Sequence, residues 1–420
     1  MNSFAELPLV EPIQRAIKEK GYAVPTPIQA QSIPALLEGR DLLGCAQTGT
    51  GKTAAFVLPI LQHLFQKRKN AVRHCPRVLI LAPTRELAAQ IGKSIQLYGK
   101  YLRITSTVIF GGVGQQPQVK ALSLGVDILV ATPGRLLDLM NQRYVRLNEV
   151  ETLVLDEADR MLDMGFIDDI KKIISTLPSK RQSLFFSATL EPKVVSLART
   201  LVHNPVHVTI NPEKPTVDRI EQCVYFVDRN RKDLLLTKFV ADPAVKRVIV
   251  FTQMKHTANK VAEMLTKAGI RSEAIHGNKS QGARTAALEA FKRGRVKVLV
   301  ATDIAARGID VEGVSHVINY ELPIDPETYV HRIGRTARAG LAGQAVSFCS
   351  GSERSLLAGI ERMIRKQIPM IRDPTFHSEA AMNASGASSR PVPRGNRSGR
   401  GHFAQGRAAS RRNSQSRGRR

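Results

Sequence analysis

Three carboxylates follow a short apolar run in the middle of this chain. The run Thr152–Leu155 breaks directly into Asp156 and Glu157, and Asp159 comes two positions later. A carboxylate at the end of a buried strand can hold a hydrated divalent cation, and its neighbour can orient or deprotonate a water molecule. The plainer alternative is that these acidic side chains only favour the N-terminus of the next helix.

A glycine-rich stretch earlier in the chain has the residues to bind a phosphate. "AQTGTGKT" (46–53) follows an apolar run, and Gly49 and Gly51 let backbone N–H groups crowd around an anion at the start of a helix. Lys52 can reach the β- and γ-phosphates, and Thr53 can ligate Mg²⁺. Ala46 departs from the usual first glycine of this pattern.

The two stretches together predict a site for a nucleoside triphosphate. Thr53 and Asp156 are expected to hold Mg²⁺, largely through water, while Glu157 acts on the attacking water and Lys52 on the phosphates. The residues expected around the nucleotide in this loop are Ala46, Gln47, Thr48, Gly49, Thr50, Gly51, Lys52 and Thr53.

These residues lie among short Val-, Ile- and Leu-rich runs that alternate with helical patterns. Many runs are apolar throughout, which is typical of parallel strands covered on both faces. The expected strands are 42–46, 78–82, 104–110, 128–131, 152–155 and 183–187, then 223–227, 248–251, 274–276, 298–301, 316–320 and 345–349. "DILVATPGR" (127–135) resembles "VKVLVATDIAARG" (296–308), and "VLILAPTRELA" resembles "VIVFTQMKHTA". This weak repeat favours two similarly built α/β domains in tandem.

Changes in composition along the chain predict where its domains begin and end. The predicted organisation is a first domain over 1–210, a linker with two prolines over 211–219, a second domain over 220–372 and a disordered tail over 373–420. From Gly386 onward the chain has ten arginines, no lysine and no acidic residue. Removing these ten charges from the net +26 leaves +16, so the folded part is expected to be basic as well.

The charge balance favours a polyanionic partner. With 62 Lys and Arg against 36 Asp and Glu, nucleic acid is expected ahead of acidic lipid, although a basic surface can also serve solubility alone.

The four cysteines are far apart without a CxxC pair, which argues against a zinc site or disulfides. The start of the chain does not read as a signal peptide and no stretch reads as a membrane span, so a cytoplasmic location is expected.

The motif Asp-Glu-Ala-Asp (156–159) also names a family. The chain resembles a DEAD-box ATP-dependent RNA helicase over about residues 4–350, which implies two RecA-like domains, ATP with Mg²⁺, and RNA. "GYAVPTPIQ" (21–29) looks like the family's Q motif, with Gln29 on the adenine edge and Tyr22 as a stacking ring. Phe4 stands where the family places a further aromatic residue.

Other stretches match in family order, and the resemblance implies their roles. "PTREL" (83–87), Gly111–Gly112, "TPGR" (132–135) and the strand end before "DIAARGID" match RNA-backbone contacts, while "SAT" (187–189) couples hydrolysis to strand separation. The implied RNA-binding residues are Pro83, Thr84, Arg85, Gly111, Gly112, Thr132, Gly134, Arg135 and Thr302, and the implied coupling residues are Asp159, Ser187, Thr189, Arg307 and His331.

The second domain is implied to complete the ATP site. "HRIGRTARAG" (331–340) makes Arg335 and Arg338 the arginine fingers, and their spacing shares a helix face if that segment is helical. Asp310 would accept from the ribose, and Arg307 would connect the domains. Ala337 replaces a glycine of many relatives, a departure expected to change little. The segment 278–291 follows the family's RNA-contact helix only loosely, so Gln281 and Arg284 receive no firm role.

The leading functional prediction is an RNA-stimulated ATPase that locally unwinds or remodels RNA duplexes and RNA–protein complexes. An RNA clamp gated by nucleotide, without productive unwinding, and a DNA translocase on the same fold remain as alternatives. The short basic tail resembles the bacterial RhlE-type branch of the family. Ribosomal precursors, in ribosome biogenesis, and RNA-decay proteins are partners that the family implies.

Overall fold

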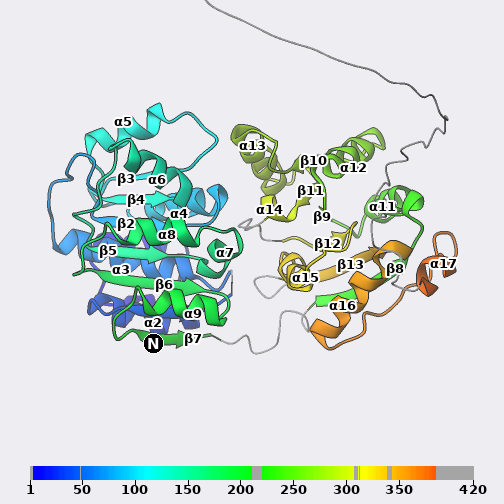
Figure 1. Ribbon diagram of the computed structural model, residues 1–420, viewed down its shortest axis with the longest axis horizontal. Helices are drawn as coiled ribbons and strands as arrows, with labels where there is room; N and C mark the ends of the chain where they lie inside the picture. Colours follow the sequence, from blue (N-terminus) through cyan, green and yellow to red (C-terminus); the bar gives the residue numbers. More distant parts are fainter. Residues whose placement is uncertain are drawn as a thin grey trace, which may run out of the picture.

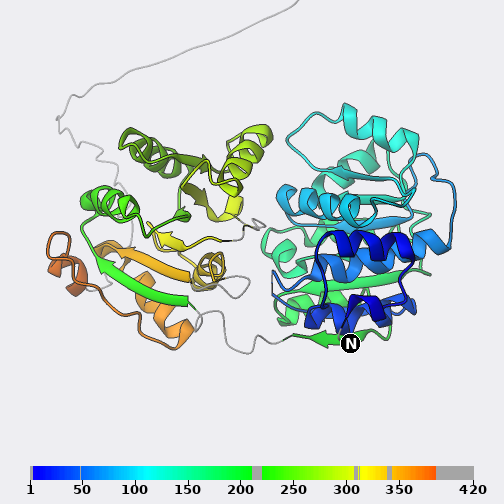
Figure 2. The same cartoon turned by 180° about the vertical axis from the view of Figure 1, so that it is seen from behind.

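The computed structural model describes residues 3–47, 49–210, 220–306, 311, 313–337 and 343–384. They form two lobes side by side, each built on a parallel β-sheet with helices on both faces (Figure 1). The view from behind shows the same two lobes meeting along one boundary (Figure 2). The predicted fold class of two tandem RecA-like α/β domains is confirmed, and the predicted linker over 211–219 lies outside the described residues.

The first lobe has a seven-stranded sheet in the order β3-β4-β2-β5-β6-β1-β7, with every pair parallel. Side chains alternate between its two faces, so Val78 and Ile80 pack with α1–α4, whereas Leu79 and Leu81 pack with α5–α9. The strands are β1 (Leu42–Cys45), β2 (Val78–Leu81), β3 (Ser106–Ile109), β4 (Ile128–Ala131), β5 (Thr152–Leu155), β6 (Gln182–Ser187) and β7 (Val206–Thr209). The helices are η1 (Phe4–Glu6), α1 (Glu11–Glu19), α2 (Pro27–Leu37), α3 (Lys52–Gln66), α4 (Arg85–Tyr98), α5 (Gln116–Leu124), α6 (Pro133–Asn141), α7 (Ala158–Asp163), α8 (Ile167–Ile174) and α9 (Pro192–Arg199).

The second lobe has a six-stranded parallel sheet in the order β10-β11-β9-β12-β13-β8. Its strands are β8 (Ile220–Phe226), β9 (Val248–Thr252), β10 (Ser272–Ile275), β11 (Val298–Thr302), β12 (His316–Asn319) and β13 (Gly343–Cys349). Its helices are η2 (Arg229–Arg231), α11 (Lys232–Ala241), α12 (Lys255–Lys267), α13 (Gln281–Lys292), α14 (Asp303–Ala306), α15 (Pro326–Ile333), η3 (Gly351–Glu353), α16 (Arg354–Ile364) and α17 (Glu379–Asn383). In Figure 1, α13, α14 and α15 lie on the side toward the first lobe.

The internal repeat in the sequence corresponds to equivalent places in the two sheets. The similar stretches 127–135 and 296–308 contain β4 and β11, each the second strand from one end of its sheet. The other pair contains β2 and β9, each the third strand. The two lobes therefore share their central strand order.

Two features of the fold differ from the sequence-based expectation. The edge strand β7 was not predicted, because "VHVT" is short and only Val208 is fully buried. The boundary at residue 373 is also wrong, since the second lobe continues through α17. Phe376 and Ala381 are buried in its core, and the His377 backbone pairs with Val227 beside β8.

The described residues contain neither a membrane-crossing helix nor a disulfide. None of the helices described has both the length and the apolar character that crossing a membrane requires. All four cysteines are described and are free thiols.

A buried lysine joins the sheet of the second lobe to its last helices. Lys232 is 2% exposed, and its Nζ donates to the carbonyls of Tyr320 (2.7 Å) and Phe348 (2.9 Å) and to Glu353 Oε2 (2.5 Å). Glu353 also accepts from the Leu322 backbone N–H at 3.1 Å. Breaking such a pair leaves a buried charge without its counterion.

Lys232→Ala is therefore expected to lower the free energy of unfolding by about 3–5 kcal/mol. Urea unfolding followed by circular dichroism measures the change. The matched control is Lys238→Ala, because Lys238 is 59% exposed in its pair with Asp373 and such pairs contribute less than about 1 kcal/mol. Equal destabilisation by the two substitutions would contradict the structural role given to Lys232.

Candidate active site

The motifs of the first lobe all begin where a strand ends, at the same edge of the sheet. The glycine-rich loop follows β1, the 156–159 carboxylates follow β5, and "SAT" closes β6; these three strands are neighbours. "PTREL", Gly111–Gly112 and "TPGR" follow β2, β3 and β4, which are neighbours in the other half of the sheet. Ligands of parallel sheets bind at this edge. The strand order thus places the predicted nucleotide residues in one half of this edge and the predicted RNA contacts in the other; we call them the nucleotide half and the RNA half for these predictions.

The glycine-rich loop has the geometry of an anion site. Gly49 and Gly51 have φ of 88° and 96°, in the left-handed region that glycine adopts easily. Gly51 caps α3, whose first residue, Lys52, is 6% exposed and donates from Nζ to the Ala46 carbonyl at 2.8 Å. The Thr50 hydroxyl donates to the Gln47 carbonyl at 2.8 Å. Thr53 is partly buried in the first turn of α3, and Thr48 lies outside the described residues.

Gln29 lies against this loop. Its Nε2 donates to the Gly51 carbonyl at 3.1 Å, and its Oε1 accepts from the Thr26 backbone N–H at 2.9 Å. An amide has a second N–H and a second lone pair, so these bonds leave capacity for a base edge. The structure therefore adds a contact that the sequence did not predict: the Q motif holds the phosphate loop directly.

Tyr22 lies in an aromatic group at the start of the chain. Its ring stacks on Phe4, with centroids 6.0 Å apart, and its hydroxyl accepts from Tyr98 Oη at 3.4 Å. Phe4 is buried, whereas Tyr22 is 37% exposed. Of the three rings, Tyr22 is thus the one that remains accessible to a base.

Asp156 is the deepest of the three carboxylates. It is 2% exposed, and its Oδ1 is buried without a hydrogen-bond partner among the described residues. Burial, opposed by the positive charge of Lys52 and assisted by Glu157, raises the pKa of Asp156 to about 6. A bound cation would favour the ionised form of this carboxyl.

Glu157 and Asp159 have partners of different kinds. Glu157 has left-handed backbone angles (φ 56°, ψ 52°), and its Oε2 accepts from Arg160 Nη1 at 2.5 Å. Asp159 Oδ2 accepts from the backbone N–H groups of Ala188 (3.0 Å) and Thr189 (3.1 Å). The neighbouring Ser187 is fully buried, and its Oγ accepts from the Thr189 N–H at 3.3 Å. The acidic motif and "SAT" are therefore joined directly.

The donor set fits Mg²⁺ held by few protein ligands. The described residues contain no group of three or more His, Cys, Asp or Glu side chains that could hold a metal ion. Mg²⁺ commonly keeps several waters and uses one or two carboxylates together with substrate phosphates. The unpartnered Asp156 oxygen, next to Lys52 and the phosphate loop, suits that arrangement.

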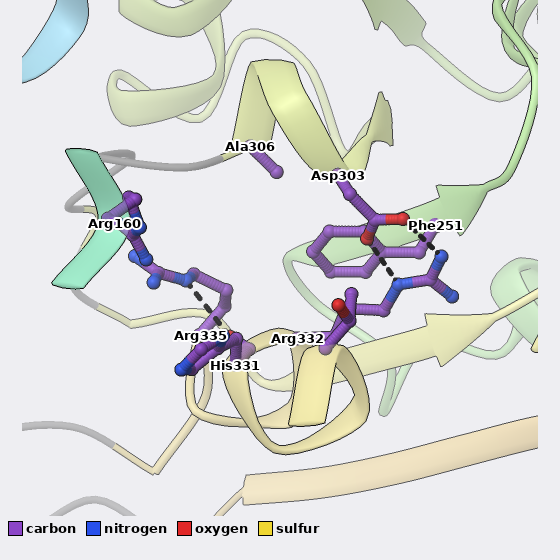
Figure 3. Close-up of a pocket in the computed structure, with 8 residues that line it drawn as sticks. Arg160, Phe251, Asp303, Ala306, His331, Arg332 and Arg335 are labelled. Atoms are coloured by element: carbon purple, nitrogen blue, oxygen red, sulfur yellow. Dashed lines mark hydrogen bonds and ion pairs between the residues drawn. The ribbon is translucent and has the colours of Figure 1, made fainter. Parts of the chain in front are cut away.

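Arg335 and His331 of the second lobe lie opposite Arg160, the residue that follows the acidic motif. Both line a small cavity at the boundary together with Arg160 of the first lobe, and the Arg335 Nε donates to the His331 carbonyl at 3.2 Å (Figure 3). Arg335 is 5% exposed. Helix α15 ends at Ile333, so Arg335 lies beyond the helix and not on one of its faces. Arg338, Arg307 and Asp310 lie outside the described residues.

The turn after Arg335 has a left-handed residue. Ala337 has φ of 53°, a conformation that costs an alanine about 1 kcal/mol and a glycine little. The departure from the family's glycine was expected to change little, yet the backbone here has the conformation that glycine favours.

Arg332 is a residue of this region whose partners the sequence did not predict. It is 1% exposed and forms a two-pronged ion pair with Asp303, at 2.5 Å and 2.8 Å (Figure 3). Its Nη1 also donates to the Glu321 carbonyl at 2.6 Å. The pair fastens α15 to the start of α14. The sequence signal for this pair was that Arg332 lies in "HRIGRTARAG" and Asp303 in "DIAARGID", two stretches that match the family.

On the RNA half of the edge, arginines converge. Burial, assisted by Arg284 and Arg135 and opposed by Glu86, lowers the pKa of Arg85. The Arg135 Nη2 donates to the Val113 carbonyl at 3.3 Å, while its Nη1 is buried without a partner in the described structure. A Cβ added at Gly112, with φ of 73°, would collide with the Arg85 guanidinium. Glu86 and Asp138 balance the charges of Arg284 and Arg135 in part, so the cluster keeps a positive charge that favours an anion.

Several backbone positions complete this half. Thr84 caps α4 by accepting from the Leu87 N–H at 3.2 Å, and Thr132 precedes α6. Gly134, in the first turn of α6, is exposed, and a Cβ there would meet nothing within 4 Å. Of the other predicted residues, Pro83 is buried before Thr84, Gly111 lies near Arg85, and Thr302 ends β11.

Glu86 links the two lobes. Its Oε1 accepts from Gln281 Nε2 at 3.1 Å and pairs with Arg284 Nη2 at 2.8 Å, with both charged side chains less than 10% exposed. Lys93 and Glu289 pair at 3.1 Å across the same helices, α4 and α13. Gln281 and Arg284, left without a firm role by the sequence, thus have a protein partner in "PTREL". The partner is distant in sequence, so sequence alone gave no sign of it.

Comparisons with known proteins agree with this geometry. The DEAD/DEAH box helicase model matches residues 26–197, and the helicase conserved C-terminal domain model matches residues 231–340. A DEAD-box ATP-dependent RNA helicase CshA of Bacillus subtilis is 42% identical over 374 residues, which cover 89% of this chain and 75% of the relative. CshA of Geobacillus kaustophilus is 41% identical over 376 residues, 90% of this chain and 79% of the relative.

Among solved structures, Saccharomyces cerevisiae Dbp5 bound to RNA and ADP BeF3 matches with a TM-score of 0.77 and 33% identity, over 88% of this chain and 96% of Dbp5. A Dbp5 variant bound to Nup159, Gle1, IP6 and ADP, also 33% identical, matches over 87% of this chain and 95% of that one with a TM-score of 0.59. The chain belongs to the family of DEAD-box ATP-dependent RNA helicases.

Proposed function

We propose that this protein hydrolyses ATP when it binds RNA and locally unwinds or remodels RNA duplexes and RNA–protein complexes. One observation carries the proposal. In a single arrangement of the lobes, Arg335 faces the nucleotide half of the first sheet edge while Arg284 reaches its RNA half. We call this arrangement, in which both contacts form, the closed arrangement. A ligand in either half therefore favours it, which couples the binding of ATP to the binding of RNA.

In the nucleotide half, the chain's own groups bind and orient the substrate. The N–H groups of 49–53 and Lys52 bind the phosphates, while Tyr22 and Gln29 contact the adenine. Glu157 orients and deprotonates the attacking water. Arg335, with Arg338 as a second finger, places positive charge against the transferred phosphoryl group, and Asp310 accepts from the ribose.

Thr53 and Asp156 are the residues proposed to hold Mg²⁺, largely through water. When bound, the ion neutralises charge on the phosphate oxygens. The unpartnered Asp156 Oδ1 beside the phosphate loop supports this assignment.

In the RNA half, contacts go to the sugar–phosphate backbone. Arg85 and Arg135 supply charge, and the N-termini of α4, α6 and α14 supply backbone donors after Thr84, Thr132 and Thr302. Glycine in an exposed first helical turn normally costs stability compared with alanine. Gly134 meets no protein atom that requires it, which supports close approach of a ligand to the α6 backbone.

Coupling between the halves is proposed to pass through "SAT". The Asp159 carboxylate holds the Ala188 and Thr189 N–H groups, so a shift of the acidic motif moves this turn. His331 and Arg307 carry the change to the second lobe. Closure bends one RNA strand and displaces its partner, and hydrolysis reopens the cleft.

ATP hydrolysis measured with single-stranded RNA, duplex RNA and DNA tests the proposal. We expect stimulation by RNA above DNA, together with ATP-dependent release of a labelled strand from a short duplex; Lys52→Ala should abolish both. RNA binding that depends on nucleotide, without strand release, would instead favour the nucleotide-gated clamp. Equal stimulation by DNA would favour the translocase.

The arginine-rich segment from Gly386 onward is proposed as an extra RNA tether. Ending the chain before Gly386 removes ten arginines, so RNA affinity should fall and the slope of log Kd against log salt should become shallower. Fluorescence anisotropy over a salt series measures both. Unchanged affinity and slope would leave this segment a spacer.

The branch of the family, the cellular location and the biological setting are proposed from the sequence. We propose the RhlE-type branch, a cytoplasmic location, and ribosomal precursors or RNA-decay complexes as the setting. Crosslinking to cellular RNA, with sequencing of the bound fragments, tests these assignments.

A further inference from the structure

Arg160 has a place that the sequence motifs do not explain. It lies one turn after Glu157 on α7, and the two side chains form a buried ion pair, with Nη1 2.5 Å from Oε2 and exposures of 8% and 5%. Glu157 is the N-cap residue of α7 and Arg160 is the third residue of the helix, so the pairing is a local one. The left-handed backbone of Glu157 (φ 56°) fixes the direction of its Cβ, and Arg160 fixes the carboxylate at the other end.

The same guanidinium reaches the boundary between the lobes. Figure 3 shows Arg160 extending from α7 toward Arg335 and His331, which approach from the α15 side. The cavity that these three residues help to line has a volume of about 10 Å³, room for about one water molecule. Arg160 therefore contacts Glu157 at one end and faces the second lobe at the other.

We propose that Arg160 is a positioning residue for ATP hydrolysis: it holds the Glu157 carboxylate in its working orientation when the lobes close. The inference rests on the proposed role of Glu157. A carboxylate with one oxygen held by a charged hydrogen bond loses rotational freedom, and its other oxygen then has a defined direction. Because Arg160 is confined at the boundary, this restraint should be strongest in the closed, RNA-bound arrangement.

A purely structural role makes a different prediction. A buried ion pair that only stabilises the fold would lower thermal stability, and hydrolysis would fall only through loss of folded protein. A positioning role lowers kcat in protein that remains folded and binds nucleotide normally. The two roles are therefore separable by kinetics.

The experiment compares Arg160→Ala, Arg160→Gln and Arg160→Lys in the full chain, with saturating RNA. We expect Arg160→Ala to lower kcat for ATP hydrolysis by about 10- to 100-fold, as for other residues that orient a reacting group through a direct contact. The KM for ATP and the affinity for a fluorescent ADP analogue should change less than about threefold, since Arg160 contacts Glu157 rather than the phosphate loop. Arg160→Lys keeps the charge and should recover part of kcat, whereas the neutral Arg160→Gln should recover less.

A double substitution tests whether Arg160 acts through Glu157. Glu157→Gln should lower kcat by about 10²- to 10⁴-fold, and adding Arg160→Ala should lower it no further. The control is Lys172→Ala, an exposed residue of α8, which should leave kcat unchanged. Thermal unfolding identifies variants that fold, and Arg160→Lys serves if Arg160→Ala does not.

Three results would overturn the inference. The first is a folded Arg160→Ala or Arg160→Lys protein whose kcat equals that of Lys172→Ala. The second is a double variant in which the effects of Arg160→Ala and Glu157→Gln on kcat multiply. The third is a loss of nucleotide affinity that accounts for the whole decrease in ATP hydrolysis. Normal hydrolysis by Glu157→Gln would reject the proposed role of Glu157 itself and the inference with it. That result is distinguishable, because it appears without any change at Arg160.

Discussion

Replacing Arg335 by alanine is expected to slow RNA-stimulated ATP hydrolysis by about 10³- to 10⁵-fold. Arg335 is 5% exposed and lines the boundary cavity opposite Arg160, so its charge acts where water is largely excluded. Electrostatic stabilisation of a developing charge is much stronger in such a site than in water. Nucleotide binding should change little, because the phosphate loop and Gln29 belong to the first lobe.

Single-turnover hydrolysis with saturating RNA measures this effect, and binding of a fluorescent ADP analogue measures nucleotide affinity. Arg362→Ala, in the exposed part of α16, is the matched control and should hydrolyse ATP normally. An Arg335→Ala protein with the normal RNA-stimulated rate would show that the second lobe does not complete the catalytic site.

Removal of the Glu86 carboxylate is expected to disfavour the closed arrangement by about 3–5 kcal/mol, the cost of leaving a buried cation without its counterion. In the closed form Arg284 is buried against Glu86, and its Nε has no hydrogen-bond partner among the described residues. With the lobes apart, water would solvate the Arg284 guanidinium. The penalty therefore falls on the closed form alone, and Glu86→Ala should weaken RNA binding by about 10²- to 10⁴-fold in the presence of a non-hydrolysable ATP analogue.

Fluorescence anisotropy with labelled RNA measures the affinity, with and without the analogue. Lys93→Ala is the control: its pair with Glu289 spans the same helices, but Lys93 is 68% exposed, so affinity should fall less than about fivefold. Combining Glu86→Ala with Arg284→Met removes the orphaned charge and should recover part of the loss. If Glu86→Ala and Lys93→Ala have equal effects, the buried contact is not what holds the lobes together.

The sequence predicted the strands of both sheets well, apart from their exact ends and β7. Runs such as 78–81 and 128–131 are apolar throughout, which is typical of parallel strands buried on both faces. The edge strand β7 lacks this signal, since only one side chain of Val206–Thr209 is fully buried. The end of the second domain was placed too early, because the few apolar residues of 373–384 pack one at a time against β8 and η3 rather than in a periodic pattern.

The partners of charged side chains were less accessible to sequence reasoning. Arg160 and Glu157 have opposite charges only three positions apart along the chain, which was a usable signal. Glu86 with Arg284, and Lys232 with Glu353, are more than a hundred positions apart, and their pairing depends on how whole elements pack.

The sequence by itself determined which residues lie at strand ends, because each motif follows directly after an apolar run and a parallel sheet presents all such ends at one edge. Tertiary structure decided which ends are neighbours. The order β3-β4-β2-β5-β6-β1 separates the predicted RNA contacts from the predicted nucleotide residues, and packing of α4 against α13 and of α7 near α15 sets what each group faces. Strand order and the meeting of the lobes arise from contacts between distant segments, which no local pattern of residues encodes.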